Sequence, residues 1–544
     1  MRPRLVSVAC AALMIASAAP VNVQEGHTVE HKTVKSRADA TQIAISVFKP
    51  GGASSTSQVP VVLHSHGWGG SRSKTVGGAV KSMLDAGFGV VSIDQRGHGE
   101  SEGEANVQDP TKETEDIKAV IDHVAALDWA QHDRDSLGNP IANDPVLGAI
   151  GGSYGGGYQT MTALDEIADE GSTRFNALAP EITWYDLPES LAPQKVVRTA
   201  WNVALYAAGS SMLPQYVHEA FAWGTATGQW PDGTIMDQPV DAAPDLDSEF
   251  HKHSPVYFAE RDIKINVPVL LRQGASDNLF NLNQGLHIFN KAVTDGARAE
   301  SYFVGYNGGH VLPNALPPGS ATSGDACSPG SFTELTIAFF KGAFAGAGTE
   351  GLLPARYNLT TADASKCVHL DNLDGTKSFK VDPLGTGNVV TTAGLGAPLH
   401  LPIEDAPSSV NGIPTLSGKL TSTGLDQRAF FGLAVGTTPA DATVVQNNLM
   451  PLRQVMPVQD GRFSIELPGV SVEVPEGESL FLTVSPVSDM SFGHSSRMPG
   501  ALVLSNLELT TQVERIEEAP PLPPPCEHPS NGKGKGKGNG RPCN

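Results

Sequence analysis

The sequence is short of cysteine, of aromatic residues and of basic side chains. It has 5 Cys among 544 residues, 6% aromatic residues, and 37 Lys and Arg against 58 Asp and Glu, for a formal net charge of -21. Binding to a polyanion needs a basic surface that displaces counterions, so the charge argues against nucleic acid as a partner. A chain of 544 residues with 40% apolar residues is too long for one core, so two or more domains are expected.

Long apolar runs are missing outside the N-terminus. Residues 5–16 are apolar behind a basic start, but this run is too short to span a bilayer. The small residues Ala16 and Ala18 predict a signal peptide over 1–18, while a lipoprotein cysteine at Cys10 is the competing interpretation. We therefore expect a secreted protein, extracellular or periplasmic, without a stable membrane anchor.

Cysteine usage fits the same compartment. Four cysteines remain once Cys10 is removed with the signal peptide: Cys327, Cys367, Cys526 and Cys543. An even number suits disulfides, and nearest pairing joins the first to the second and the third to the fourth, although three connectivities are possible. No metal site is predicted, since no two cysteines have C-x-x-C spacing. His251 and His253 are expected to be solvated, because no nearby carboxylate or cysteine completes a site.

A glycine-bracketed serine stands out in the first half of the chain. Residues 150–157 read Ile-Gly-Gly-Ser-Tyr-Gly-Gly-Gly and follow the apolar run 145–150. A sharp turn from a strand into a helix pushes a serine side chain out of the backbone, where a base can activate it. Gly151 and Gly155 would allow that turn. We interpret Ser153 as the nucleophile; alone, G-x-S-x-G is a weak signal, and an ordinary glycine-rich loop is the alternative.

Strand and helix patterns alternate before this serine. Apolar runs over 42–48, 59–65 and 87–93 predict strands, and helical periodicity covers 74–86 and 112–127. The alternation predicts a parallel sheet with helices on both faces. The second strand ends in a glycine-rich loop around Trp68, which is either a simple turn or a loop that points a backbone N–H at a developing oxyanion.

Two further polar residues follow later strands. Asp277 comes after a strand predicted at 265–274, and His310 after one at 299–304. The order Ser, Asp, His, with each residue after a strand, resembles that of the α/β-hydrolases, and this resemblance implies that His310 takes the proton from Ser153. Asp277 would fix the His310 tautomer and stabilise the imidazolium. Backbone N–H groups of Tyr154 and Trp68 are the predicted oxyanion hole.

The segment 94–101, Asp-Gln-Arg-Gly-His-Gly-Glu-Ser, adds a more specific signal. With the Ser153 motif downstream, it resembles the α/β-hydrolase superfamily. The resemblance implies a doubly wound, mainly parallel sheet, and it implies that His98 shapes a loop and is not the base. The segment at about 187–258, rich in Trp, Tyr, Met and Ala, is expected to form a helical cap over the pocket.

From about residue 354 the pattern changes to short alternating runs between turns, which predicts a β-sandwich. The segment 476–485 ahead of 501–504 resembles the C-terminal jelly roll of peptidase S15 and cocaine-esterase-like (CocE/NonD) serine hydrolases. We expect an α/β catalytic domain over 27–350, a β-sandwich over 354–515 and a disordered Pro/Gly/Lys-rich tail over 516–544.

The resemblance implies cleavage of acyl esters or release of Xaa-Pro dipeptides. Some cocaine-esterase-like members use a tyrosine hydroxyl in the oxyanion loop, where this chain has Trp68. A dipeptidyl peptidase needs a carboxylate for the substrate's α-ammonium, and Glu181, Asp186 and Glu189 are candidates.

We predict a serine esterase that acts on a small-molecule or polymeric ester and needs no metal or organic cofactor. A serine peptidase acting on peptides, or a non-catalytic binding protein on a hydrolase scaffold, is the alternative. The sequence does not predict an oligomeric state.

Overall fold

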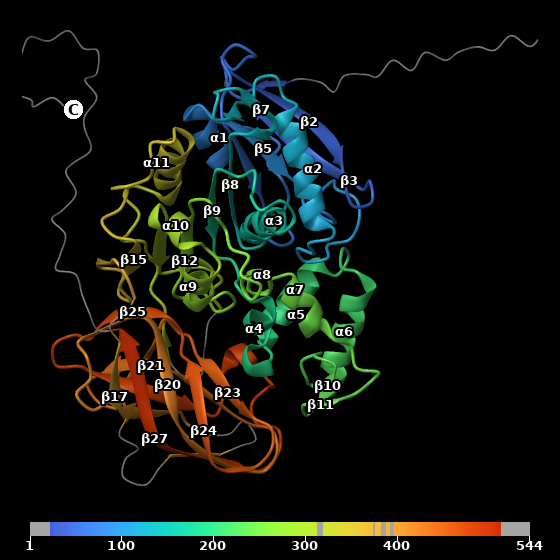
Figure 1. Cartoon of the computed structure of the whole chain (residues 1–544). Helices are drawn as coiled ribbons and strands as arrows, with labels where there is room; N and C mark the ends of the chain where they lie inside the picture. The colour runs from blue at the N-terminus through green and yellow to red at the C-terminus, as the bar shows by residue number, and fades with distance from the viewer. Residues whose placement is uncertain are drawn as a thin grey trace, which may run out of the picture.

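The structure, a computed structural model, describes residues 22–24, 26–312, 319–373, 376–381, 388–391 and 396–512. It has an α/β part, a cap beside it and a β-rich part below (Figure 1). The predicted signal peptide, the predicted tail, and Cys10, Cys526 and Cys543 lie outside the described residues.

The α/β part is built on an eleven-stranded sheet. In spatial order its strands are β1 (Asn22–Gln24), β2 (His27–Lys35), β3 (Gln42–Lys49), β5 (Gly89–Ile93), β4 (Val61–Ser65), β8 (Leu147–Gly152), β9 (Ala177–Glu181), β12 (Leu270–Gly274), β13 (Tyr302–Tyr306), β15 (Tyr357–Thr360) and β16 (Cys367–Leu370). The strands from β5 to β15 run parallel, and the outer pairs are antiparallel. This mainly parallel sheet confirms the predicted fold class.

Helices cover both faces of the sheet, as the alternation predicts. On one face lie α1 (Gly78–Asp85) and α11 (Phe332–Phe344); on the other lie α2 (Glu113–Ala125), α3 (Tyr154–Glu170), α8 (Pro255–Ala259), α9 (Leu282–Lys291) and α10 (Asp295–Ala299). Helix α2 buries an apolar stripe against the sheet, which consists of Ile117, Val120, Ile121 and Val124. Helix α1 begins at Gly78 and not at residue 74, because glycine disfavours a helix interior and Gly77 and Gly78 therefore mark the start of the helix.

The cap is inserted between β9 and α8. It consists of α4 (Leu187–Leu191), η1 (Pro193–Lys195), α5 (Thr199–Gly209), α6 (Gln215–Thr227), the short hairpin of β10 (Thr234–Ile235) and β11 (Gln238–Pro239), and α7 (Leu246–Lys252). These elements match the helical region predicted from the sequence. Their buried side chains form one apolar cluster with Trp184, Leu279 and Phe280 of the α/β part.

The β-rich part has two sheets packed against one another, which confirms the predicted sandwich. One sheet contains β14 (Gly319–Ser320), β22 (Thr443–Val445), β21 (Gln427–Gly436), β26 (Ser479–Ser485), β19 (Leu399–Pro402) and β23 (Met450–Gln454). The other contains β17 (Thr376–Lys380), β27 (Ala501–Gln512), β20 (Ser409–Thr423), β24 (Val458–Glu466), β18 (Asn388–Thr391) and β25 (Val470–Glu473). Leucine, valine and phenylalanine side chains from both sheets form the core between them.

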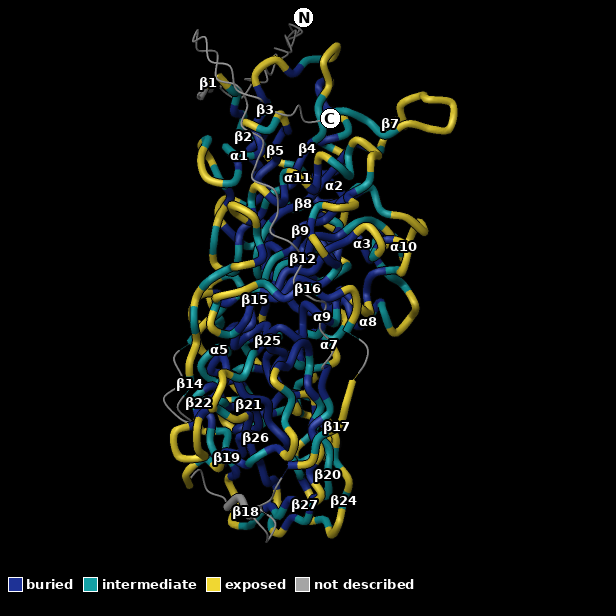
Figure 2. Tube along the Cα trace, turned by 90° about the vertical axis from the view of Figure 1, so that its left-hand side faces the viewer, coloured by how far each residue is buried: buried dark blue, intermediate teal, exposed yellow. Residues whose placement is uncertain are grey.

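Two features differ from the sequence prediction. Strands β15 and β16 join the large sheet, so this sheet continues past residue 354, where the β-sandwich is predicted to begin. The hairpin of β6 (His132–Arg134) and β7 (Pro140–Pro145) was not predicted, and its tip is exposed (Figure 2). Its residues are mostly polar, so they carry no strand periodicity.

A disulfide joins Cys327 to Cys367 across a sequence separation of 40, which confirms the first predicted pairing. Because Cys367 is the first residue of β16, the bond lies within the α/β part. It therefore does not cross from the α/β part into the β-rich part, as the predicted boundary near residue 354 would imply.

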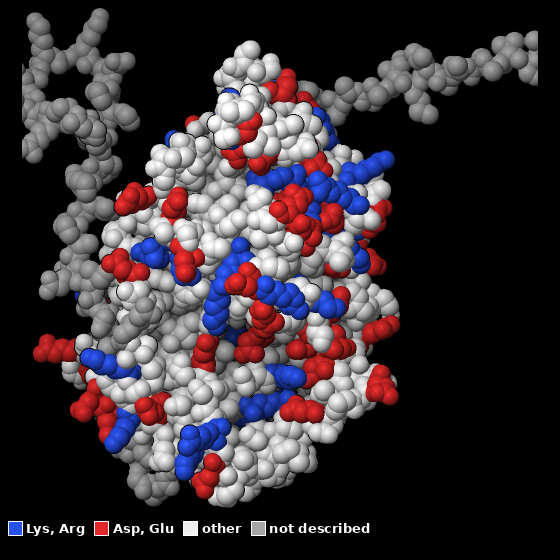
Figure 3. All heavy atoms as spheres, in the orientation of Figure 1, with Lys and Arg blue, Asp and Glu red and all other residues white. Residues whose placement is uncertain are grey.

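On the face drawn in Figure 3, Lys and Arg side chains are intermixed with Asp and Glu. Across the described ranges, no helix has the length and apolar character needed to cross a membrane.

Candidate active site

Ser153 lies on the turn between β8 and α3, as the predicted sharp turn from a strand into a helix requires. Its φ of 58° and ψ of -122° are a strained backbone conformation for a residue with a side chain. A β-carbon at Gly151 would lie 2.5 Å from the carbonyl oxygen of Gly155, and one at Gly155 would lie 2.7 Å from that of Ser65. Both glycines are therefore required by close backbone approach.

The structure brings Ser153, His310 and Asp277 together. Ser153 Oγ lies 2.9 Å from His310 Nε2, and His310 Nδ1 lies 2.7 Å from Asp277 Oδ2. The three residues follow β8, β13 and β12, which are parallel, so their carboxyl ends meet at one edge of the sheet. This geometry allows a proton to pass from the hydroxyl to the imidazole.

Asp277 is completely buried and accepts four hydrogen bonds. The backbone N–H groups of Leu279 and Phe280 donate to Oδ1 at 2.8 and 2.6 Å. The backbone N–H and the ring of His310 meet Oδ2 at 2.9 and 2.7 Å. A β-carbon at Gly309 would lie 2.5 Å from Oδ2, so a larger residue there would displace the carboxylate.

The pKa of His310 is set by two opposed effects. Burial lowers it, but the charge of Asp277 and the hydrogen bond to it outweigh burial, so the pKa is raised above its ordinary value. The carboxylate therefore stabilises the imidazolium, which is the form that a general base adopts after it accepts a proton.

The loop around Trp68 runs beside the nucleophile. A β-carbon at Gly67 would lie 3.7 Å from Ser153 Cβ. The indole N–H of Trp68 donates to the carbonyl oxygen of Leu205 in α5 at 2.9 Å, so this group is bound to the cap. Tyr154 is the first residue of α3, and a helix leaves its first N–H groups without internal partners.

His98 is held away from the nucleophile. Its ring lies beside those of His66, Trp68 and Tyr154, and its Nδ1 is 3.0 Å from the carbonyl oxygen of Arg96. Burial lowers its pKa to about 4, so it is neutral near pH 7. This placement agrees with the structural role implied by the resemblance.

A cavity of about 350 Å³ has Ser153 in its wall. Most of its lining is apolar and comes from the cap, including Leu191, Leu205, Tyr206, Leu213, Val217 and Trp230. Among the described residues that line it, none is Asp or Glu, and the one charged side chain is Arg497 of the β-rich part. The cavity therefore suits an uncharged, apolar group bound beside Ser153.

The three predicted carboxylates do not line this cavity. Glu181 forms an ion pair with Arg272 at 2.9 Å, and Asp186 caps α4 by accepting from the N–H of Glu189. Burial and the neighbouring Asp186 raise the pKa of Glu189 to about 8. Glu181 lies beside the nucleophile, since its carbonyl oxygen accepts from the N–H of Ser153 at 3.0 Å, but its carboxylate is paired with Arg272.

Side chains from outside the predicted site hold the Asp277 loop. Asn448 Nδ2 donates to the Asp277 carbonyl oxygen at 2.9 Å, and Asn278 Nδ2 donates to that of Asn447 at 3.1 Å. Gln446 accepts a hydrogen bond from the hydroxyl of Ser276. The turn 446–448 of the β-rich part thus holds the loop of Asp277 in the α/β part.

Arg198, at the start of α5, supports the same loop from the cap. It is buried and donates through one guanidinium nitrogen to the carbonyl oxygens of Asn278 and Leu279. Sequence reasoning missed it and the turn 446–448. The run Gln-Asn-Asn between two strands was the available signal, but it is also ordinary turn composition.

Comparison with known proteins agrees with this description. The model of the X-Pro dipeptidyl-peptidase (S15) family matches residues 39–311, a range that includes Ser153, Asp277 and His310. Similar solved structures include a CocE/NonD family hydrolase from Staphylococcus aureus, with a TM-score of 0.60, 12% identity, and coverage of 90% of this chain and 94% of that one.

Two other solved structures share this two-part architecture. An aminopeptidase from a marine sediment archaeon, Thaumarchaeota archaeon, has a TM-score of 0.57 and 14% identity, with coverage of 92% and 100% of the two chains. An α-amino acid ester hydrolase has a TM-score of 0.54 and 13% identity, also with coverage of 92% and 100%. At these identities the likeness concerns the fold alone.

Among curated proteins, the uncharacterized protein YcjY of Escherichia coli K12 is 30% identical over 121 residues, which are 22% of this chain and 36% of YcjY. The chain thus spans about a third of the length of the curated relatives it matches.

Proposed function

This chain belongs to the X-Pro dipeptidyl-peptidase (S15) family, and from that premise we propose that it is a serine hydrolase that cleaves carboxylic esters with an apolar acyl group. One observation carries the proposal: Ser153, hydrogen-bonded to His310, forms part of the wall of an apolar cavity. In this role Ser153 is the nucleophile, His310 the general base and Asp277 its partner.

The first half of the reaction forms an acyl-enzyme. Ser153 Oγ attacks the ester carbonyl carbon while His310 Nε2, 2.9 Å away, takes the hydroxyl proton. Asp277 stabilises the imidazolium. The backbone N–H groups of Tyr154 and Trp68 hold the tetrahedral oxyanion, and loss of one such donor typically costs about 10²–10³ in rate.

Loss of the alcohol completes the acyl-enzyme, and hydrolysis of the acyl-enzyme then regenerates the enzyme. The carbon–oxygen bond to the alcohol breaks, and His310 gives its proton to the leaving oxygen, so the acyl group remains on Ser153. A water molecule then attacks the acyl carbon while His310 accepts one of its protons. Collapse of this intermediate releases the carboxylic acid and returns the proton to Ser153 Oγ.

The apolar lining of the cavity at Ser153 favours esters over X-Pro peptides as substrates. A dipeptidyl peptidase must bind a substrate ammonium, and a charge that loses water in an apolar cavity is costly without a partner. The cavity residues described include no carboxylate, whereas a neutral acyl chain gains about 25 cal/mol for each Å² of apolar surface buried. Peptidase activity is the second candidate, because the family description names it.

A panel of substrates tests both candidates. The purified protein is assayed with p-nitrophenyl esters from acetyl to long acyl chains and with Xaa-Pro-p-nitroanilides. We expect ester turnover that improves with acyl length and falls by at least about 10⁴-fold in Ser153→Ala. Ser172→Ala, at an exposed serine, is the matched control and should keep full activity.

Two results would change the assignment. Selective release from the prolyl anilides would make the protein a dipeptidyl peptidase. If neither substrate class reacts and a fluorophosphonate probe leaves Ser153 unlabelled, the protein is a non-catalytic binding protein on a hydrolase scaffold.

We also infer that the protein is exported. The disulfide between Cys327 and Cys367 supports this, because disulfides persist in oxidising compartments. Mass spectrometry of the protein recovered outside the cytoplasm should find the chain beginning at Ala19. A chain beginning at a lipid-modified Cys10 would instead show membrane anchoring.

A further inference from the structure

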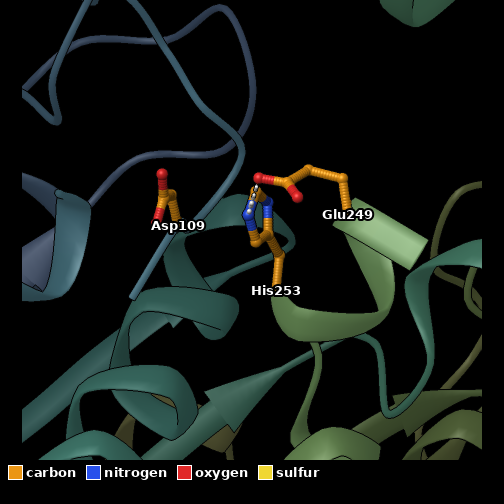
Figure 4. Close-up of side chains that lie close together, drawn as sticks. All are labelled: Asp109, Glu249 and His253. Carbon is orange, nitrogen blue, oxygen red and sulfur yellow. Dashed lines mark ion pairs between the residues drawn. The ribbon is translucent and has the colours of Figure 1, made fainter. Parts of the chain in front are cut away.

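Three side chains that can bind a metal meet where the cap contacts the α/β part. Asp109 lies on the loop before α2, Glu249 lies on α7, and His253 follows the last residue of α7. Each offers one ligand atom, and these atoms lie within 4.8 Å of one another. Figure 4 shows the Glu249 carboxylate reaching the His253 ring, with Asp109 on the neighbouring chain segment.

His253 was expected to be solvated, and the structure contradicts this. The residue is 1% exposed, whereas His251 stays near the surface and pairs with Glu260 at 3.0 Å. Among the described residues neither ring nitrogen of His253 has a hydrogen bond: Nδ1 is buried without a partner, and Nε2 lies 3.7 Å from Glu249 Oε1. Buried polar atoms are normally satisfied, so Nδ1 lacks the partner expected of it, and Nε2 is the nitrogen that faces Glu249 without a hydrogen bond.

The spacing of His253 and Glu249 suits a shared ion. The distance of 3.7 Å is too long for a hydrogen bond. Two ligands that each lie about 2.1 Å from one tetrahedral ion, and so subtend an angle of about 109° there, are about 3.4 Å apart. The separation of the pair is close to that value.

One oxygen of each carboxylate is available to the ion. Asp109 Oδ1 accepts hydrogen bonds from the N–H and hydroxyl of Thr111, and Glu249 Oε2 pairs with Lys252 at 3.0 Å. Within the described ranges, Asp109 Oδ2 accepts no hydrogen bond and Glu249 Oε1 meets only His253. Each carboxylate thus keeps a free oxygen for coordination.

A second cluster in the same molecule provides a contrast. Glu115, Asp165 and Asp169 also lie within 4.8 Å of one another, but Lys118 Nζ is 2.8 Å from a carboxylate oxygen of each. That cluster already contains its cation. In the cluster of Asp109 and Glu249, the ammonium of Lys252 pairs with one carboxylate, at 3.0 Å from Glu249 Oε2, and no ion pair joins Asp109 to a Lys or Arg among the described residues.

We propose that Asp109, Glu249 and His253 bind one divalent metal ion that ties the cap to the α/β part. One imidazole and two carboxylates match Zn²⁺, with water completing its coordination. The ligands lie next to the cavity: Val107 precedes Asp109 by two residues, Phe250 follows Glu249, and both line it. The ion therefore holds two walls of the cavity together.

Metal binding is tested on the purified mature protein after removal of bound metal with EDTA. Zn²⁺ is titrated by isothermal calorimetry, and thermal unfolding is followed with and without the ion. We expect one Zn²⁺ per chain and a higher unfolding temperature, because an ion that binds the folded state stabilises it. Asp109→Asn and Glu249→Gln should each weaken the affinity at least about tenfold and reduce the thermal shift.

Asp169→Asn, in the cluster that contains Lys118, is the matched control and should bind Zn²⁺ as the parent does. The absence of stoichiometric binding in the parent, or binding that survives both ligand substitutions, overturns the proposal. Thermal unfolding of each variant in EDTA shows whether that variant folds without metal. If only one of Asp109→Asn and Glu249→Gln folds, that variant alone is enough to test metal binding. The readout needs no substrate, so its result is independent of the esterase assignment.

Discussion

Replacement of Asp277 by asparagine tests the proposed active site most sharply, because the structure predicts how the new amide must orient. Asp277 Oδ1 accepts from the N–H groups of Leu279 and Phe280, and Oδ2 accepts from the N–H and ring of His310. An amide has one oxygen and one NH₂ group, so in either orientation its NH₂ faces two groups that now donate.

The cost of the two orientations decides between them. With NH₂ at the Oδ1 position, two backbone N–H groups lose their acceptor. With NH₂ at the Oδ2 position, one backbone N–H loses its acceptor, because His310 Nδ1 can give up its proton and accept from the amide. Each orphaned donor costs about 1–3 kcal/mol, so the second orientation is favoured by about that amount.

The favoured orientation gives the wrong tautomer. His310 then carries its proton on Nε2, donates to Ser153 and cannot accept the hydroxyl proton. We expect Asp277→Asn to lower kcat by about 10⁴-fold. The free energy of unfolding should fall by about 1–3 kcal/mol for the one orphaned N–H.

The assay compares kcat/KM for a p-nitrophenyl ester from pH 5 to 9, together with chemical unfolding. Asp262→Asn, at an exposed residue paired with Lys264, is the control and should change stability by less than about 0.5 kcal/mol. If Asp277→Asn keeps more than a tenth of the parent kcat/KM while Ser153→Ala is inactive, Asp277 does not set the tautomer and the reasoning fails.

Three further outcomes are expected. Because the pKa of His310 is raised, kcat/KM should increase with pH through a pKa above the ordinary value of histidine, which a pH–rate profile checks. The charged His310 ring should also stabilise the folded protein. This stabilisation is complete below the ordinary pKa and is lost as pH rises through the folded-state pKa, which unfolding at several pH values checks. Trp68→Phe removes the hydrogen bond to α5 and should raise KM for long acyl esters more than it lowers kcat, with a stability loss of about 1 kcal/mol; an equal KM for all acyl lengths would contradict this. Replacing Cys327 and Cys367 by serine should lower the free energy of unfolding by about 4 kcal/mol, measured by urea denaturation, because a closed loop with a separation of 40 is released; an unchanged midpoint would refute it.

The candidate site could be predicted because a turn that exposes a serine needs small residues around it. A β-carbon at Gly151 would meet the carbonyl oxygen of Gly155 within the same turn, and one at Gly155 would meet that of Ser65 on the neighbouring strand β4. Asp277 and His310 could be found because each follows an apolar strand, and parallel strands bring their ends to one edge. The same regularity predicts the sheet and its covering helices.

The contacts that hold the site in place were not predictable in the same way. Asn448 meets Asp277 through tertiary packing across a separation of 171 residues, and nothing in its local sequence marks it. The burial of His253 depends on how α7 packs onto the loop of Asp109, and the hydrophobic periodicity of the sequence does not predict this packing. Strands β15 and β16 resemble sandwich strands locally, and their sheet is decided by their neighbours.

The hydrogen bonds between the turn 446–448 and the loop of Asp277 imply that the proposed hydrolysis requires a folded β-rich part. A fragment trimmed to the size of a single-domain hydrolase would keep all three chemical groups and lose the partners that orient one of them. Heating should have the same effect: activity would disappear at the temperature where the sandwich melts, even if the α/β part were still folded. Loss of the proposed ester turnover would therefore report loss of the contact between the sandwich and the Asp277 loop.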